Sequence, residues 1–191
     1  IRRPRLLAGL LGLYRQVHPW LPAPWRRLPG PPAPVAGATG SRADSRIALF
    51  TGCLARPYEA GLRRGLIDCL AAMGIAIAEP AAQNCCGSVH AHAGNEEAAS
   101  ALARQNRDAF AGAQTVLTLA SGCHESVARS LDGAAGVTDA IEFLEEQMRA
   151  RGTALRWRRC DERIALHLPC TQRNVVHSVA SLRRLLSAVP G

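Results

Sequence analysis

The sequence of 191 residues has no lysine, few aromatic residues and no long hydrophobic run. All 23 basic residues are Arg, against 15 Asp and Glu, which gives a net charge of +8. Aromatic residues make up 4% of the chain, so the core has to be built from small and branched aliphatic side chains. The longest apolar stretch, residues 6–14, is far shorter than the ~20 residues of a membrane-spanning helix. No transmembrane segment is therefore predicted, and a hydrophobic content of 48% excludes a disordered chain.

The arginines are also not concentrated as they are in nucleic-acid-binding proteins. They are scattered along the chain, apart from short groups at residues 2–5 and 156–159. Nucleic-acid-binding proteins place basic residues on one face or tail, often with stacking aromatic residues. We expect no nucleic-acid partner, and we attribute the Arg and Ala excess to a GC-rich coding bias.

Several catalytic and secretory patterns are missing as well. The sequence has no Ser-His-Asp order and no Gly-rich dinucleotide fingerprint, and Glu96-Glu97 is best interpreted as the acidic first turn of a helix. Seven Cys is an odd number and too few for a disulfide scaffold. The composition therefore favours a cytoplasmic protein that uses its cysteines chemically.

The first 45 residues are predicted to be a helix followed by a linker. Leu6, Leu10, Leu13 and Val17 follow helical spacing. The preceding arginines resemble the start of a signal peptide, but no small-residue cleavage site follows. Seven Pro between residues 19 and 45 predict an extended linker.

From residue 46 onward, strand and helix patterns alternate. Short apolar strands are predicted at 46–50, 75–78, 115–119 and 163–167, and helices at 58–73, 96–110, 137–148 and 172–188. This alternation predicts an α/β fold, with a mostly parallel sheet and flanking helices. We expect one module over residues 46–160 and the truncated start of a second over 161–191, which makes the chain a fragment.

Five of the seven cysteines directly follow predicted strands. In a parallel sheet, ligands bind beyond the carboxyl ends of the strands, so these cysteines are expected at one edge. They are Cys53, Cys85, Cys86, Cys123 and Cys170. Cys69 lies on the apolar face of a predicted helix and is interpreted as a small buried hydrophobe. No role is assigned to Cys160.

Clustered thiolates suit zinc or iron–sulfur clusters. Zinc sites usually contain pairs of cysteines two residues apart, and no such pair occurs here. The side chains of adjacent Cys85 and Cys86 diverge, so they reach different irons of a cluster more easily than one ion. A vicinal disulfide is the other interpretation, although it is strained and rare. Gly87 allows the backbone to approach a bulky cofactor closely.

These residues carry a resemblance to a known family. The order of Cys53, Cys85-Cys86-Gly87 and Cys123 resembles the cysteine-rich CCG module of heterodisulfide reductase B-type subunits, lactate-utilisation proteins and glycolate oxidase iron–sulfur subunits. The local strings are most similar to those of the glycolate oxidase subunit. They are Thr51–Leu54, Asn84–His92, Ala120–Cys123 and His167–Cys170.

The resemblance implies an iron–sulfur cluster, of the 4Fe-4S type, ligated by the cysteines of the module. It also implies a partner subunit that carries FAD and oxidises glycolate or another 2-hydroxy acid, a quinone as electron acceptor, and a place in the cytoplasm or on the inner membrane face. A subunit that cleaves disulfides directly and a structural zinc module are the alternatives.

Three features depart from the family pattern. Ala120 stands where the fuller motif has a cysteine, an upstream ferredoxin-like region is missing, and no second CCG follows Cys170. Of the histidines, His90 and His92 in the CCG loop and His124 beside Cys123 are predicted to contact the cofactor, either as hydrogen-bond donors to sulfur or as proton carriers.

Overall fold

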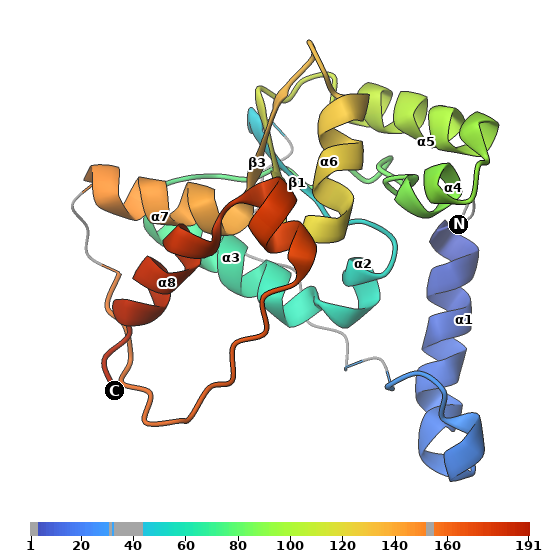
Figure 1. Ribbon diagram of the computed structural model, residues 1–191, viewed down its shortest axis with the longest axis horizontal. Coiled ribbons are helices and arrows are strands. Elements are labelled where there is room, and N and C mark those ends of the chain that lie inside the picture. Colours follow the sequence, from blue (N-terminus) through green and yellow to red (C-terminus); the bar gives the residue numbers. More distant parts are fainter. Residues whose placement is uncertain (1–3, 31, 33–43, 152–154) are drawn as a thin grey trace.

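The computed structural model describes residues 4–30, 32, 44–151 and 155–191 and has an α/β architecture (Figure 1). Three parallel strands form one sheet in the order β1 (Ile47–Phe50), β2 (Thr115–Thr118) and β3 (Gly136–Asp139). Ala78 adds one parallel bridge to Ala48 on the free side of β1. The α-helices are α1 (Pro4–Val17), α2 (Ala55–Tyr58), α3 (Ala60–Ala72), α4 (Ser88–His92), α5 (Glu96–Ala109), α6 (Ser121–Ser130), α7 (Ala140–Arg151) and α8 (Val179–Ser187).

Helices cover both faces of the sheet. Alternate strand residues point to opposite sides, and apolar residues on both sides pack against helices. Ala48, Phe50 and Val116 pack with residues of α5 and α6 in one core cluster. Leu49 and Leu117 pack with residues of α3 and α7 in the other. The predicted α/β fold is therefore confirmed, with Leu, Ile, Val and Ala filling most of both layers.

Individual strands differ from the prediction. Residues 75–78 contribute a single bridge instead of a full strand. Val137, which its spacing assigns to a helix, lies in β3 opposite Val116, and the helix begins only at Ala140. The strand expected at 163–167 is wrong: the segment has no helix or strand, and Ile164 is 65% exposed.

The C-terminal segment packs on the first module through polar contacts. Ser121 and Thr171 share a hydrogen bond of 2.7 Å, and Arg184 on α8 pairs with Glu145 on α7 at 2.8 Å. The pattern predicted over 172–188 forms two pieces, a π-helical turn η3 (Gln172–Val176) and α8, which are separated at His177, where φ is +61°. This region thus contacts α6 and α7, while Val175 and Leu186 of its predicted apolar face are exposed.

The N-terminal segment forms a helical hairpin with its own contacts. Helix α1 lies where a helix is predicted, but two single turns follow it, η1 (His18–Trp20) and η2 (Ala23–Trp25), where an extended linker is expected. The linker residues 31 and 33–43 lie outside the described residues. In the part of the chain that the structure describes, no helix is long and apolar enough to cross a membrane.

Asp139 connects the end of β3 to α7, and its substitution tests this junction. Its side chain is 2% exposed, and its Oδ1 accepts hydrogen bonds from the backbone N–H groups of Ile141 and Glu142. Asp139→Ala leaves both N–H groups without this acceptor and is expected to lower the free energy of unfolding by about 1–3 kcal/mol. Asp139→Asn keeps the oxygen and should cost less, as urea unfolding of both variants will show.

The same residue makes stability depend on pH. Burial raises the pKa of Asp139, against the lowering effect of hydrogen bonds from Ser178 and the backbone. The folded protein therefore binds this proton more tightly than the unfolded chain does. As pH falls through the raised pKa, the wild type should gain stability relative to Asp139→Asn. A constant difference between the two proteins from neutral to acidic pH contradicts this assignment.

Candidate metal centre

Four cysteines from three separate loops meet at the carboxyl edge of the sheet. Cys53 follows β1, Cys85 and Cys86 lie in the loop after the Ala78 bridge, and Cys123 lies in the first turn of α6 after β2. All four belong to, or pack against, the core cluster on the α5 and α6 side. The parallel topology explains this meeting, because every strand that precedes a cysteine ends at the same edge.

The thiols contact one another directly. The Cys53 thiol donates to Cys85 Sγ at a distance of 3.6 Å. Hydrogen bonds from the Cys53 and Cys86 thiols lower the pKa of Cys85 to about 2, and a hydrogen bond from Cys86 lowers the pKa of Cys123. The same hydrogen bonds, together with burial, raise the pKa values of Cys53 and Cys86. The four thiols are therefore close enough to shift one another's pKa values in opposite directions.

This arrangement fits a cationic, sulfur-preferring cofactor. Thiolates in a largely buried cluster are costly unless a cation compensates their charge. Among the described residues, no group of three or more His, Cys, Asp or Glu side chains is arranged around a single metal ion. An iron–sulfur cluster carries several irons, so its thiolate ligands need not surround one point.

Two buried amide side chains hold the cysteine loops in place. Gln83 is 2% exposed; its Oε1 accepts from the Thr51 N–H at 2.7 Å, and its Nε2 donates to the Leu49 carbonyl at 3.0 Å. It thereby ties the loop before Cys85 to the end of β1, just before Cys53. This one side chain thus gives hydrogen-bond partners to two backbone groups, the Thr51 N–H and the Leu49 carbonyl.

Asn106 on α5 performs the same task from the other side. It is fully buried; its Oδ1 accepts from the Asn84 N–H at 2.8 Å, and its Nδ2 donates to the Cys85 carbonyl at 2.9 Å. Sequence analysis missed both amides. A signal was present for Asn106, since residues 98, 102, 106 and 110 share one helical face and the other three are apolar.

Gly87 ends the double-cysteine loop with a backbone that other residues rarely adopt. Its φ is +83°, and an added Cβ would lie 3.4 Å from both the Cα and the carbonyl oxygen of Ala99. Gly87→Ala is expected to cost about 1–2 kcal/mol of stability and to displace Cys86. Thermal unfolding should show this loss, whereas Gly61→Ala, in open space on α3, should not lower stability. Equal effects of the two substitutions contradict the assignment.

The other predicted site residues have different surroundings. Cys170 is exposed and lies outside the core cluster that contains the other four cysteines. His124 Nδ1 lies 2.7 Å from Thr118 Oγ1, at the end of β2. His90 and His92 lie on α4, directly after Gly87; His90 is partly buried and His92 is exposed.

The two cysteines without a predicted metal role lie elsewhere. Cys69, interpreted from the sequence as a small buried hydrophobe, is only partly buried on α3. Cys160 donates its backbone N–H to the Pro190 carbonyl at 2.8 Å, which joins the two ends of the C-terminal segment.

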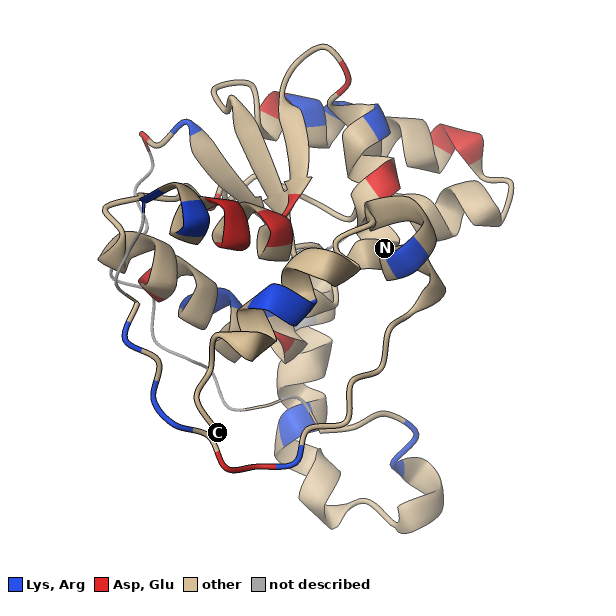
Figure 2. Cartoon of the chain, turned by 60° about the vertical axis from the view of Figure 1, so that its left-hand side comes forward, with Lys and Arg blue, Asp and Glu red and all other residues tan. Residues whose placement is uncertain are grey.

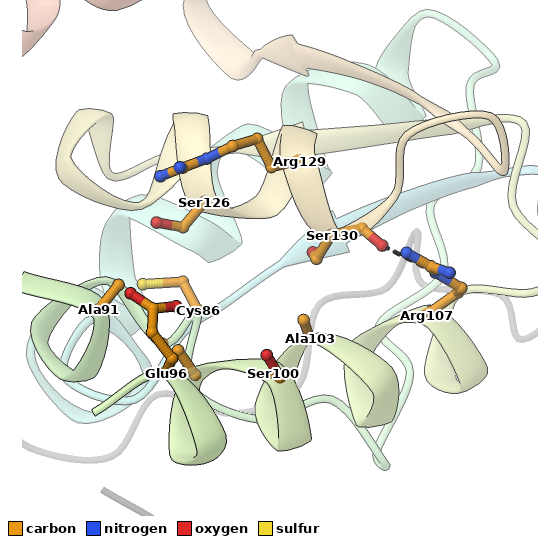
Figure 3. A pocket seen from close by; sticks show the side chains of 11 residues that line it. Cys86, Ala91, Glu96, Ser100, Ala103, Arg107, Ser126, Arg129 and Ser130 are labelled. Carbon is orange, nitrogen blue, oxygen red and sulfur yellow. Dashed lines mark hydrogen bonds between the residues drawn. The ribbon is translucent and has the colours of Figure 1, made fainter. Parts of the chain in front are cut away.

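An open pocket of about 220 Å³ reaches the cysteine cluster at Cys86. Figure 3 shows Cys86 and Glu96 at one end of this pocket and Arg107 at the other. The Arg107 Nε donates to the Ser130 carbonyl at 3.0 Å. Most of the remaining lining is polar or small: Gly87, Ala91, Ala99, Ser100, Ala103, Ser126, Arg129 and Ser130. The pocket therefore offers polar groups of both charge signs next to one thiol.

Comparison with known proteins agrees with this geometry. Residues 47–128 match the family described as the cysteine-rich domain, CCG. The glycolate oxidase iron-sulfur subunit of Escherichia coli is 27% identical over 187 residues, which cover 90% of this chain and 46% of that protein. One of the subunits of the fumarate reductase (CoM/CoB) of Methanothermobacter marburgensis is 26% identical over 157 residues, or 81% of this chain and 31% of that protein.

A third relative matches over a shorter stretch. The probable glycolate oxidase iron-sulfur subunit of Bacillus subtilis is 35% identical over 80 residues, which cover 41% of this chain and 18% of that protein. The chain thus spans less than half the length of each of these curated relatives. No solved structure matches it.

Proposed function

Since residues 47–128 match the CCG cysteine-rich domain, we propose that the chain is an iron–sulfur electron-transfer subunit of a flavin-dependent 2-hydroxy-acid dehydrogenase, with glycolate as the substrate class. The convergence of Cys53, Cys85, Cys86 and Cys123 is the observation that carries this proposal. The iron-sulfur subunits among its relatives support the electron-transfer role.

In this proposal the four thiolates ligate one cluster of the 4Fe-4S type. The cluster supplies a one-electron carrier, while the chemistry on the substrate belongs to a partner subunit that carries FAD. Gly87 keeps the backbone at the cluster compact. His90, His92 and His124 would supply hydrogen bonds around the cluster, and such bonds help set the reduction potential. Ala120 leaves the cluster one ligand short of the fuller motif.

The electron acceptor in this proposal is a quinone, which places the complex in the cytoplasm or on the inner membrane face. The first test is analysis of iron and acid-labile sulfide in anaerobically purified protein. Comparable amounts of iron and sulfide support the proposal. Zinc without sulfide would instead identify a structural zinc module.

The pocket at Cys86 favours a second candidate, a subunit that acts on thiols or disulfides as heterodisulfide reductases do. A substrate sulfur in this pocket would lie next to a cluster ligand, and the relative named for CoM/CoB is similar over most of the chain. Addition of a small thiol to the reconstituted protein separates the two candidates. If the thiol changes the electron paramagnetic resonance spectrum, and Ser126→Trp in the pocket wall abolishes this change, the thiol-active subunit is favoured. If the thiol leaves the spectrum unchanged, pure electron transfer is favoured.

We also propose that residues 161–191, with Cys170, belong to a second cysteine-rich module. The exposed segment around Ile164 supports this separation, while the contacts of α8 with α7 oppose it. Limited proteolysis distinguishes a separate second module from a segment that belongs to the first module. Rapid loss of residues 161–191 with survival of 46–160 supports a separate module, and equal resistance shows that the segment belongs to the first.

A further inference from the structure

The net positive charge of the protein resides almost entirely in its N-terminal arm, defined here as residues 1–43. The arm contains seven Arg and no Asp or Glu. The remaining 16 Arg nearly balance the 15 acidic residues of the rest of the chain. In Figure 2, the described part of the arm shows blue positions and no red ones. A cationic segment of this kind is attracted to anionic surfaces.

The inner face of α1 is already used by the arm itself. Leu11 is buried, and Tyr14 packs edge-on against His18 with ring centroids 5.3 Å apart. The Tyr14 hydroxyl donates to the Leu28 carbonyl at 2.6 Å. Arg26 donates to the carbonyls of Leu21 and Pro19 at 2.8 and 2.9 Å. These contacts fold the segment after α1 back along the helix, so the hairpin holds its own shape.

The outer face of α1 is apolar and exposed. Leu6, Leu10 and Leu13 are 54–57% exposed, and Val17 continues their stripe along the helix. Beyond the helix end, Trp20 and Trp25 are also exposed. In Figure 1 the helix extends away from the sheet and its covering helices. The outer face therefore combines an aliphatic stripe with two tryptophans at one end.

We propose that the described hairpin of this arm, residues 4–30, binds the surface of an anionic lipid bilayer. An amphipathic helix lies in the interface with its apolar face among the acyl chains and its cations at the headgroups. Tryptophan prefers this boundary because its ring is apolar and its N–H is polar. A protein groove could bury the stripe as well, but the complete lack of acidic residues beside seven Arg favours lipid phosphates as the complementary surface. The inference goes beyond the proposed function and does not depend on a bound cluster.

Vesicle co-sedimentation of the full chain tests the proposal. The protein should bind vesicles that contain phosphatidylglycerol, bind phosphatidylcholine vesicles more weakly, and dissociate at high salt. The double substitution Leu10→Glu and Leu13→Glu should weaken binding at least about tenfold, because it places two charges in the apolar stripe. Leu62→Glu changes a leucine of α3 that is 60% exposed and serves as the matched control. It should bind as the wild type does.

A second measurement reports on the arm itself. The chain has three tryptophans, so Trp157→Phe leaves only Trp20 and Trp25. Their fluorescence should shift to shorter wavelength on vesicles and be quenched by brominated lipid. Absence of vesicle binding, or equal binding by the double variant and the wild type, overturns the proposal. If the double variant instead fails only to co-purify with a flavin subunit, the stripe is a protein interface and the lipid proposal is wrong.

Discussion

Cys86→Ser is expected to remove most of the iron that the anaerobically purified protein binds. Cys86 is buried at the centre of the cysteine cluster, with Cys85 on one side and Cys123 on the other. A serine hydroxyl is a poor substitute for a thiolate toward iron in a sulfur cluster. Loss of one of four ligands should reduce bound iron and sulfide severalfold and abolish the visible absorption of the cluster.

Cys69→Ser is the matched control for this experiment. Cys69 is partly buried on α3, away from the other thiols, and burial raises its pKa. Its substitution should leave iron and sulfide unchanged, and Cys160→Ser should do the same. If Cys69→Ser removes as much iron as Cys86→Ser, the four-cysteine site is incorrect. The site is also incorrect if Cys86→Ser binds as much iron as the wild type.

Asn106→Leu is expected to destabilise the protein by about 2–4 kcal/mol, because two backbone groups, one buried and one partly buried, lose their partners. These groups are the Asn84 N–H and the Cys85 carbonyl, on either side of the bond that leads into the double-cysteine loop. Leucine has a similar volume, so the loss would come from hydrogen bonding more than from a cavity. Such a loss is a large part of the ~5–15 kcal/mol by which domains are stable.

Gln105→Leu is the control, since it replaces the neighbouring amide on the exposed side of α5. It should change the free energy of unfolding by no more than about 0.5 kcal/mol. Chemical denaturation of both variants without metal measures the stability effect, and iron analysis then shows whether a looser loop also binds less cofactor. Equal stability of Asn106→Leu and wild type would mean that the amide does not hold the loop.

The local pattern of the sequence was enough to place the cysteine cluster. Short apolar runs at 46–50 and 115–119 predict parallel strands, which the structure has at 47–50 and 115–118, and Cys53 and Cys123 follow within a few residues. Because parallel strands end at the same edge, the meeting of these loops follows from topology alone. To place Cys85 and Cys86 at the same edge, residues 75–78 only have to run parallel to β1. The single parallel bridge between Ala78 and Ala48 shows that they do.

Tertiary structure decided what local patterns leave ambiguous. The apolar residue Val137 is compatible both with a strand and with the start of the following helix. Its pairing with Val116 of β2 selects the strand. The run at 163–167 has strand composition but pairs with no described strand, and the sheet ends at β3. Strand propensity is expressed only where a partner supplies hydrogen bonds.

The sequence by itself determined the α/β class, the convergent cysteines and the amphipathic N-terminal helix, because each depends on periodicity and position along the chain. Only the tertiary structure identified Gln83 and Asn106 as the supports of the cysteine loops. Their hydrogen bonds join residues 21 to 34 positions apart. A buried amide has no periodic signal of its own. Its role is set by backbone groups that other segments leave unpaired, and those are known only once the chain has folded.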